Sequence, residues 1–276
     1  MKKLCLAFML LFAMQAGKLC AQIETEDAMP LAQGQVELGG GLEYQTSKEG
    51  KETALPLALE YGLSKRFTLL VEPVAFTNIH PKTGRHVTGF GDLEMTLFYQ
   101  LMKETKSFPA ISLSAEIKLP TAKDTLIGTG KTDFTPFLIA SKTTGKFFTS
   151  INFSYTFLGK PPGVVANNLF NYALGTIFEA SEKSIIFAEV YGNTSALGGG
   201  DVPEGTFPPL PGNPGKTTEI SGGETVASIG YGYYVNKNLQ LSFGISYDNN
   251  NAVLFRPGII WTSQDGRNFF KRPSHK

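Results

Sequence analysis

Residues 35–45 read QVELGGGLEYQ, and their side chains alternate in character along the chain. Apolar residues, from Val36 to Tyr44, fall on one face of an extended chain, whereas Glu37 and Glu43 fall on the other. A period of two is typical of a β-strand whose two faces meet different surroundings. The stretch therefore predicts a strand with one apolar and one polar face.

The same alternation returns along the rest of the chain, and no stretch shows a sustained helical period. The further predicted strands are residues 55–63, 67–71, 93–101, 111–119, 133–141, 147–157, 170–178, 185–191, 227–235, 239–247 and 255–261. Together with the first they make about twelve strands, most of them about nine to eleven residues long, which is the length of a tilted strand that crosses a bilayer.

The predicted connections tend to alternate between short and long. Residues 64–66, 142–146 and 236–238 are short turns, whereas residues 78–89 and 193–222 are long loops. In an up-and-down antiparallel sheet, alternate connections lie at the same end, so the short and the long ones gather at opposite rims. Barrels of the bacterial outer membrane have this asymmetry.

The apolar faces of all predicted strands lack Asp, Glu, Lys and Arg. A charge on the lipid side of a membrane barrel costs roughly 2–4 kcal/mol near the bilayer midplane, so this absence favours a face that meets lipid. A periplasmic β-sandwich, which packs its apolar faces together, is an alternative with the same period. We predict an all-β transmembrane antiparallel up-and-down β-barrel.

Ionisable side chains on the opposite faces are the candidate site residues. We expect these to line the lumen and contact solute: Glu37, Glu60, Glu72, Glu94, Glu116, Lys118, Glu189 and Arg256. Unpaired buried charges are costly, so we expect water or ion pairs around them. An ion pair between Glu37 and Arg256 is expected because the first and last strands must meet in a closed barrel.

The first residues have the composition of an export signal. Lys2 and Lys3 precede an apolar run over residues 4–14, which is too short for a membrane-spanning helix. We predict a signal peptide over residues 1–21 and one outer-membrane barrel domain over residues 22–276. Cys5 and Cys20 would leave with the signal, so no thiol chemistry is expected in the exported chain.

Other chemistry finds little support in the sequence. The run GTGKTDF at residues 128–134 resembles a phosphate-binding loop, but Thr125 stands where that motif needs its first glycine. The 25 basic and 24 acidic residues give no excess charge that would suit nucleic acid. His80, His86 and His275 lie in no catalytic or metal-ligand motif, so we expect no catalytic residues, cofactor or metal.

Several stretches resemble one family of barrels. They are TEDAMPLAQGQVELGGGLEY from residue 25, EYGLSKRFTLLVE from residue 60, GFGDLEMTLFYQL from residue 89, LSAEIKLPTAK from residue 113, GTGKTDFTPFLIASK from residue 128 and FRPGIIW from residue 255. In this order they resemble the bacterial outer-membrane barrels named after the meta-pathway of phenol degradation. The resemblance implies an outer-membrane transporter for hydrophobic or aromatic small molecules, and it implies no catalytic residues.

The sequence therefore predicts passive or facilitated passage of small solutes, aromatic or hydrophobic ones included, through a narrow acidic lumen. The expected partners are outer-membrane lipid, the solute and the barrel-assembly machinery, and not nucleic acid. One alternative is a non-conducting structural barrel that binds partners through residues 193–222. Another is a membrane-embedded hydrolase that uses His86 with one of the many carboxylates.

Overall fold

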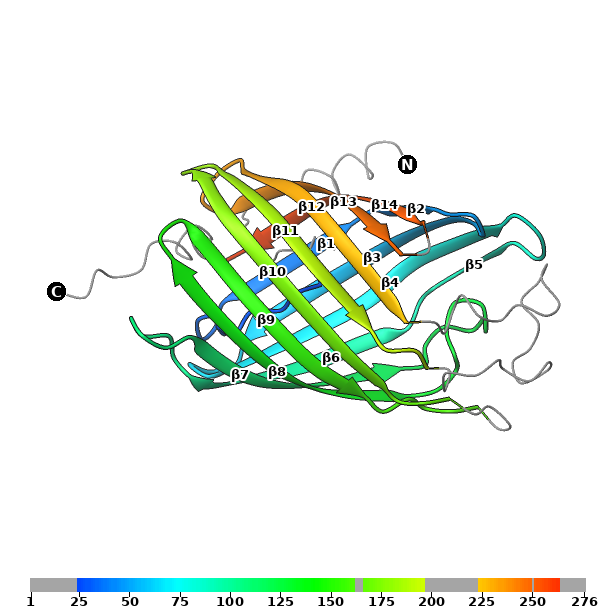
Figure 1. The fold of residues 1–276 in the computed structure, drawn as a ribbon, viewed down its shortest axis with the longest axis horizontal. Helices are drawn as coiled ribbons and strands as arrows, with labels where there is room; N and C mark the ends of the chain where they lie inside the picture. The colour runs from blue at the N-terminus through cyan, green and yellow to red at the C-terminus, as the bar shows by residue number, and fades with distance from the viewer. Residues whose placement is uncertain (1–23, 162–165, 197–222, 250, 264–276) are drawn as a thin grey trace, which may run out of the picture.

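A computed structural model describes residues 24–161, 166–196, 223–249 and 251–263, and over these ranges the chain forms one closed antiparallel sheet (Figure 1). The predicted signal peptide and most of the predicted loop at residues 193–222 lie outside the described residues. Within the described part there is no helix long and apolar enough to cross a membrane. All regular structure in those ranges is β-strand.

The strands follow the alternating stretches closely. Their bounds are β1 (Val36–Gly41), β2 (Glu43–Thr46), β3 (Gly50–Gly62), β4 (Phe67–Pro81), β5 (Val87–Gly89), β6 (Leu93–Met102), β7 (Ala110–Leu119), β8 (Asp133–Thr144), β9 (Phe147–Thr156), β10 (Leu169–Ser181), β11 (Ser184–Asn193), β12 (Glu224–Tyr234), β13 (Leu239–Asp248) and β14 (Val253–Thr262).

These segments make a closed barrel of twelve crossings in the described chain. β1 and β2 are two halves of one crossing, separated at Leu42, and β5 is a short partner of β4 beyond the main wall. From β6 to β14 each strand pairs with the next one in sequence. The barrel closes where β1 pairs with β14, with Glu37 opposite Thr262. The prediction of about twelve antiparallel strands is confirmed.

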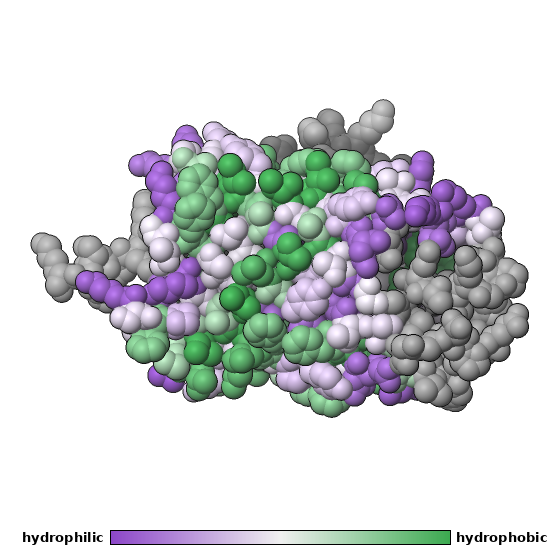
Figure 2. Space-filling view, viewed as in Figure 1, coloured by the Kyte–Doolittle hydropathy of each residue, from purple (hydrophilic) through white to green (hydrophobic). Residues whose placement is uncertain are grey.

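The apolar faces of the strands point outward. Leu57, Leu97 and Phe243 are 39%, 42% and 45% exposed although they lie in the middle of paired strands. Hydrophobic residues gather over the middle of the face shown in Figure 2, and hydrophilic residues gather toward both ends. A β-sandwich would bury these side chains instead. The arrangement is that of a barrel whose outer wall meets hydrocarbon.

The two ends of the barrel differ, as the alternation of connections predicts. Tight turns join β3 to β4, β8 to β9, β10 to β11 and β12 to β13, and we call their end the short-turn rim. The β4–β5 hairpin and the connection over residues 120–132 extend from the opposite end, the long-loop rim (Figure 1).

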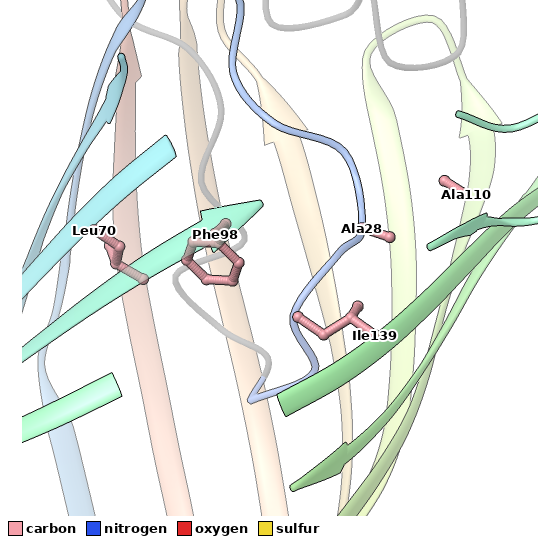
Figure 3. Close-up of a cluster of buried hydrophobic side chains, with 5 residues drawn as sticks. All are labelled: Ala28, Leu70, Phe98, Ala110 and Ile139. Carbon is pink, nitrogen blue, oxygen red and sulfur yellow. The ribbon is translucent and has the colours of Figure 1, made fainter. Parts of the chain in front are cut away.

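Residues 24–35 precede the first strand, and we call them the N-terminal segment. They pass along the inside of the barrel. Figure 3 shows the chain at Ala28 running between the wall strands that carry Leu70 and Phe98 and the one that carries Ile139. Ala28 is fully buried, and it belongs to one apolar cluster with these three residues. The N-terminal segment therefore occupies part of the lumen.

Candidate solute pathway

Polar side chains of the wall hold the tip of the N-terminal segment near the middle of the barrel. The Glu189 carboxylate on β11 accepts hydrogen bonds from the Glu24 amide at 2.9 Å, the Thr25 amide at 3.1 Å and the Thr25 hydroxyl at 3.0 Å. Asn152 on β9 accepts from the Glu26 amide at 2.6 Å and donates to the Glu26 carbonyl at 2.8 Å. These side chains provide hydrogen-bond partners for backbone groups of the segment that are not paired with a β-strand.

Further bonds follow the segment toward the short-turn rim. The Ala28 amide donates to the Ser141 hydroxyl at 2.8 Å, and its carbonyl accepts from Ser112 at 2.8 Å and from Gln100 at 3.1 Å. The Leu31 amide donates to the Thr68 hydroxyl at 3.0 Å. Each such bond contributes roughly 0.5–1.5 kcal/mol net, so the segment is held by many exchangeable contacts.

An apolar collar surrounds Ala28 and Met29 at the level of these bonds. The collar consists of inward side chains from the ends of strands near the short-turn rim: Leu70, Phe98, Ala110, Ile139, Phe148, Ile177, Ile185, Phe187 and Tyr234. Met29 packs against both halves of this set. The collar and the N-terminal segment therefore pack against each other at this level and narrow the lumen around Met29.

A row of charged side chains crosses the wall closer to the long-loop rim. Glu72 on β4 lies opposite Glu94 on β6, which lies opposite Lys118 on β7, which lies opposite Asp133 on β8. The Lys118 ammonium is 2.5 Å from an Asp133 oxygen and 3.8 Å from an Asp92 oxygen. Lys118 therefore compensates the Asp133 end of the row, and two carboxyl groups, those of Glu72 and Glu94, lie opposite each other at the other end.

The other predicted glutamates lie in two places. Glu60 and Glu116 come within electrostatic range of Glu26 in the N-terminal segment, so carboxylates of wall and segment face one another. Glu37 is 2% exposed and lies opposite Glu60 in the β1–β3 pairing. The structure thus places Glu60, Glu72, Glu94 and Glu116 on one side of the lumen and Glu189 and Arg256 around the tip of the segment.

Arg256 has different partners from the one that the sequence predicted. Its guanidinium lies 2.5 Å from Glu24 and 2.9 Å from Glu43. The predicted ion pair with Glu37 is wrong, because Glu37 pairs with Thr262 across the seam and Arg256 precedes Thr262 by six residues, about 20 Å of strand. Strand tilt brings the β2 half of the first crossing, not β1, to the level of Arg256.

The sequence prediction missed the side chains that hold the N-terminal segment. Several inward positions on β7, β8 and β9 are small and polar, including Ser112, Ser141 and Asn152. Small polar residues leave room beside the wall and offer both donors and acceptors. This run of small polar residues is the one sequence signal that could have indicated a second stretch of chain in the lumen.

The histidine pair belongs to the outer β4–β5 hairpin. The rings of His80 and His86 stack with centroids 3.7 Å apart, and His86 Nε2 is 2.5 Å from the Asn78 side-chain oxygen. Thr88 is 3.4 Å from the same nitrogen. The hydrogen-bond partners recorded for His86 among the described residues include no carboxylate, and no group of three potential metal ligands occurs in that part of the chain.

Known structures share this barrel architecture. No model of a protein family matches the sequence, and no curated protein matches it. The COG4313 outer membrane channel from Pseudomonas putida F1 superposes with a TM-score of 0.65 at 12% identity, covering 87% of this chain and 100% of that one. The NanC porin gives a TM-score of 0.55 at 10% identity, covering 82% and 98%. A KdgM porin in complex with disordered oligogalacturonate gives 0.52 at 10% identity, with the same coverage. At these identities the similarity establishes that the chain has the fold of these outer-membrane barrels.

Proposed function

We propose that the protein is an outer-membrane channel for small solutes. The observation that carries this proposal is the inversion of the barrel, whose outer wall is apolar and whose inner wall carries ionisable side chains. An inner wall of this kind needs water or paired charges. Similarity to the fold of outer-membrane channels and porins supports the proposal, and by the same analogy the short-turn rim faces the periplasm.

The inner charges make cations and neutral polar molecules the favoured solutes. Glu60, Glu72, Glu94 and Glu116 line one side, and Lys118 among them is already paired with Asp133. A pathway lined by one sign of charge concentrates solutes of the opposite sign. The collar adds aromatic rings, including Phe98, Phe148 and Phe187, which suit a solute with an aromatic part.

Planar-bilayer recordings in a salt gradient test this selectivity. The reversal potential of the wild-type channel should show cation preference, and E72Q/E94Q should move it toward zero. E49Q/E182Q is the matched control, because it removes the same charge at two exposed positions outside the row. An equal shift in both variants would disprove the role of the inner row.

Liposome swelling tests the solute class. Benzylamine should enter proteoliposomes faster than benzoate, because both are small aromatic molecules but only benzylamine carries a positive charge. Equal rates would remove the charge argument. If no solute passes even through the R256Q variant described below, the alternative of a non-conducting structural barrel, which the occupied lumen favours, replaces the channel.

A further inference from the structure

We propose that residues 24–35 form a displaceable plug that closes the channel from the short-turn side. This inference rests on the proposed channel function and adds a closed state to it. The segment and the collar pack against each other at Ala28 and Met29. A segment seated there narrows the lumen, and its movement away from the collar would widen the path for a solute.

The contacts that hold the plug are of a kind that can be exchanged for water. They are hydrogen bonds from wall side chains, such as those of Asn152 and Ser141, to the backbone of the plug. Residues 24–276 contain no cysteine, so no disulfide joins the segment to the wall. A segment held in this way can leave as a unit and return.

Carboxyl groups of the plug lie close to carboxyl groups of the wall. Glu26 lies near Glu60 and Glu116 on the wall, and Asp27 is its neighbour in the plug. None of these groups attracts the plug to the wall as a cation would. The ion pair between Glu24 and Arg256 holds the tip instead, so loss of this pair should release the plug.

The base of the plug is continuous with β1 and is bonded to the end of β3. The Gly34 amide donates to the Gly62 carbonyl at 2.8 Å, and the Gly62 amide donates to the Gln35 carbonyl at 2.9 Å. These backbone bonds at the end of β3 join the plug to the wall as a short extension of the sheet. Displacement therefore starts at the tip and turns about this base.

A reversible disulfide tests the proposal directly. The Ala28 amide is 2.8 Å from the Ser141 hydroxyl, so A28C/S141C joins plug to wall in a chain whose exported part has no other cysteine. S228C/S246C is the matched control, because these residues are directly opposed on β12 and β13 and their hydroxyls are 2.8 Å apart. Its disulfide joins two strands of the wall and does not tether the plug.

Oxidised A28C/S141C should conduct at least tenfold less than the reduced form in planar bilayers, and the control pair should conduct equally in both states. Equal conductance of oxidised and reduced A28C/S141C, with the disulfide verified on gels, would overturn the plug. If neither form conducts and R256Q is silent as well, the channel function fails instead.

A second readout follows the plug without any need for conductance. In the single variant A28C, a water-soluble maleimide should label Cys at position 28 at least tenfold more slowly than in K48C, an exposed position of the β2–β3 turn. Adding R256Q should accelerate labelling at position 28 and leave position 48 unchanged. Rapid labelling in A28C alone, or no acceleration by R256Q, would contradict a plug that seats and leaves.

Discussion

Arg256 and Glu24 are 232 residues apart in the sequence, and their side chains meet inside the barrel at 2.5 Å. Arg256 belongs to the last strand, whereas Glu24 belongs to the segment that precedes the first. The Arg256 side chain is 9% exposed, so the pair lies largely out of bulk water and its loss cannot be fully replaced by hydration. The contact links the wall of the barrel to the contents of its lumen.

Replacing Arg256 with Gln should destabilise the seated N-terminal segment. The substitution removes the cation that Glu24 and Glu43 share. A hydrogen bond to a charged group contributes roughly 1.5–3 kcal/mol, and we expect a loss at the lower end of this range because Glu24 is half exposed. We expect the open fraction in single-channel recordings to rise about tenfold. R256K, which keeps the charge, should lie between the wild type and R256Q, and an unchanged open fraction in R256Q would contradict the role of the pair.

Gly62 lies at the base of the segment, where a side chain has no space. A Cβ there would collide with the Ala32 carbonyl oxygen, which is backbone and cannot turn aside. We expect G62A to shift the base of the segment and to raise basal conductance. In G40A the added methyl meets the flexible Leu57 side chain at 2.9 Å, so this variant should conduct as the wild type does. Equal conductance of all three proteins would argue against a tightly packed base.

A charge on the outer wall should destabilise the barrel according to its depth. Leu97 lies in the middle of β6 and is 42% exposed, whereas Leu63 is 44% exposed just beyond the end of β3. Unfolding by urea in lipid vesicles should show a loss of about 2–4 kcal/mol for L97K and about 0–1 kcal/mol for L63K. Similar losses for the two variants would mean that the outer wall does not meet a bilayer as described.

The outer loops should respond to acid through Asp124. Arg85 donates two hydrogen bonds to this carboxylate, at 2.6 and 2.8 Å, and these hold the pKa of Asp124 below its ordinary value. A carboxyl group with a lowered pKa stabilises the folded contact above its ordinary pKa, and this stabilisation is lost as the pH falls through the lowered one. Amide exchange near Asp124 should therefore accelerate as the pH falls below about 4, after correction for the intrinsic pH dependence of exchange.

The matched variant R85Q should exchange faster at neutral pH and respond less to acid, because the group that lowers the pKa of Asp124 is gone. A pH response in R85Q as large as in the wild type would assign the effect to other carboxyl groups. Arg85 is exposed and Asp124 is partly exposed, so the effect on global stability should be small.

The fold could be predicted because residues alternate between the lipid-facing and the lumen-facing side along each strand, and this alternation can be read from each strand alone. Leu57 and Leu97 mark an outer face without knowledge of any neighbour, and the same rule places Glu60 and Glu94 on the other side. The inward direction of Phe98, Phe148 and Ile177 agrees with their phase within the strands, since all three are buried. Phe76 has the same phase as the buried Leu70 on β4 but is 38% exposed.

The contents of the lumen could not be predicted in the same way. The partner of Arg256 depends on strand tilt and on a segment with no period of its own, and neither property is local. Asn152 and Ser141 bind backbone groups of the segment. Because every residue carries these groups, the sequence of the segment shows no pattern that would identify its partners on the wall. The signal peptide over residues 1–21, the family named after phenol degradation and the roles of the inner glutamates stay predictions.

The N-terminal segment also has a consequence for how the molecule acquires its shape. Its backbone is bonded to six strands that surround it in the closed barrel, β4, β6, β7, β8, β9 and β11. A growing sheet that curls around this peptide brings β1 and β14 toward each other and lowers the entropic barrier to joining ends so distant in the chain. The N-terminal segment would thus act as a template around which the sheet closes during folding. Its removal should slow refolding into detergent micelles.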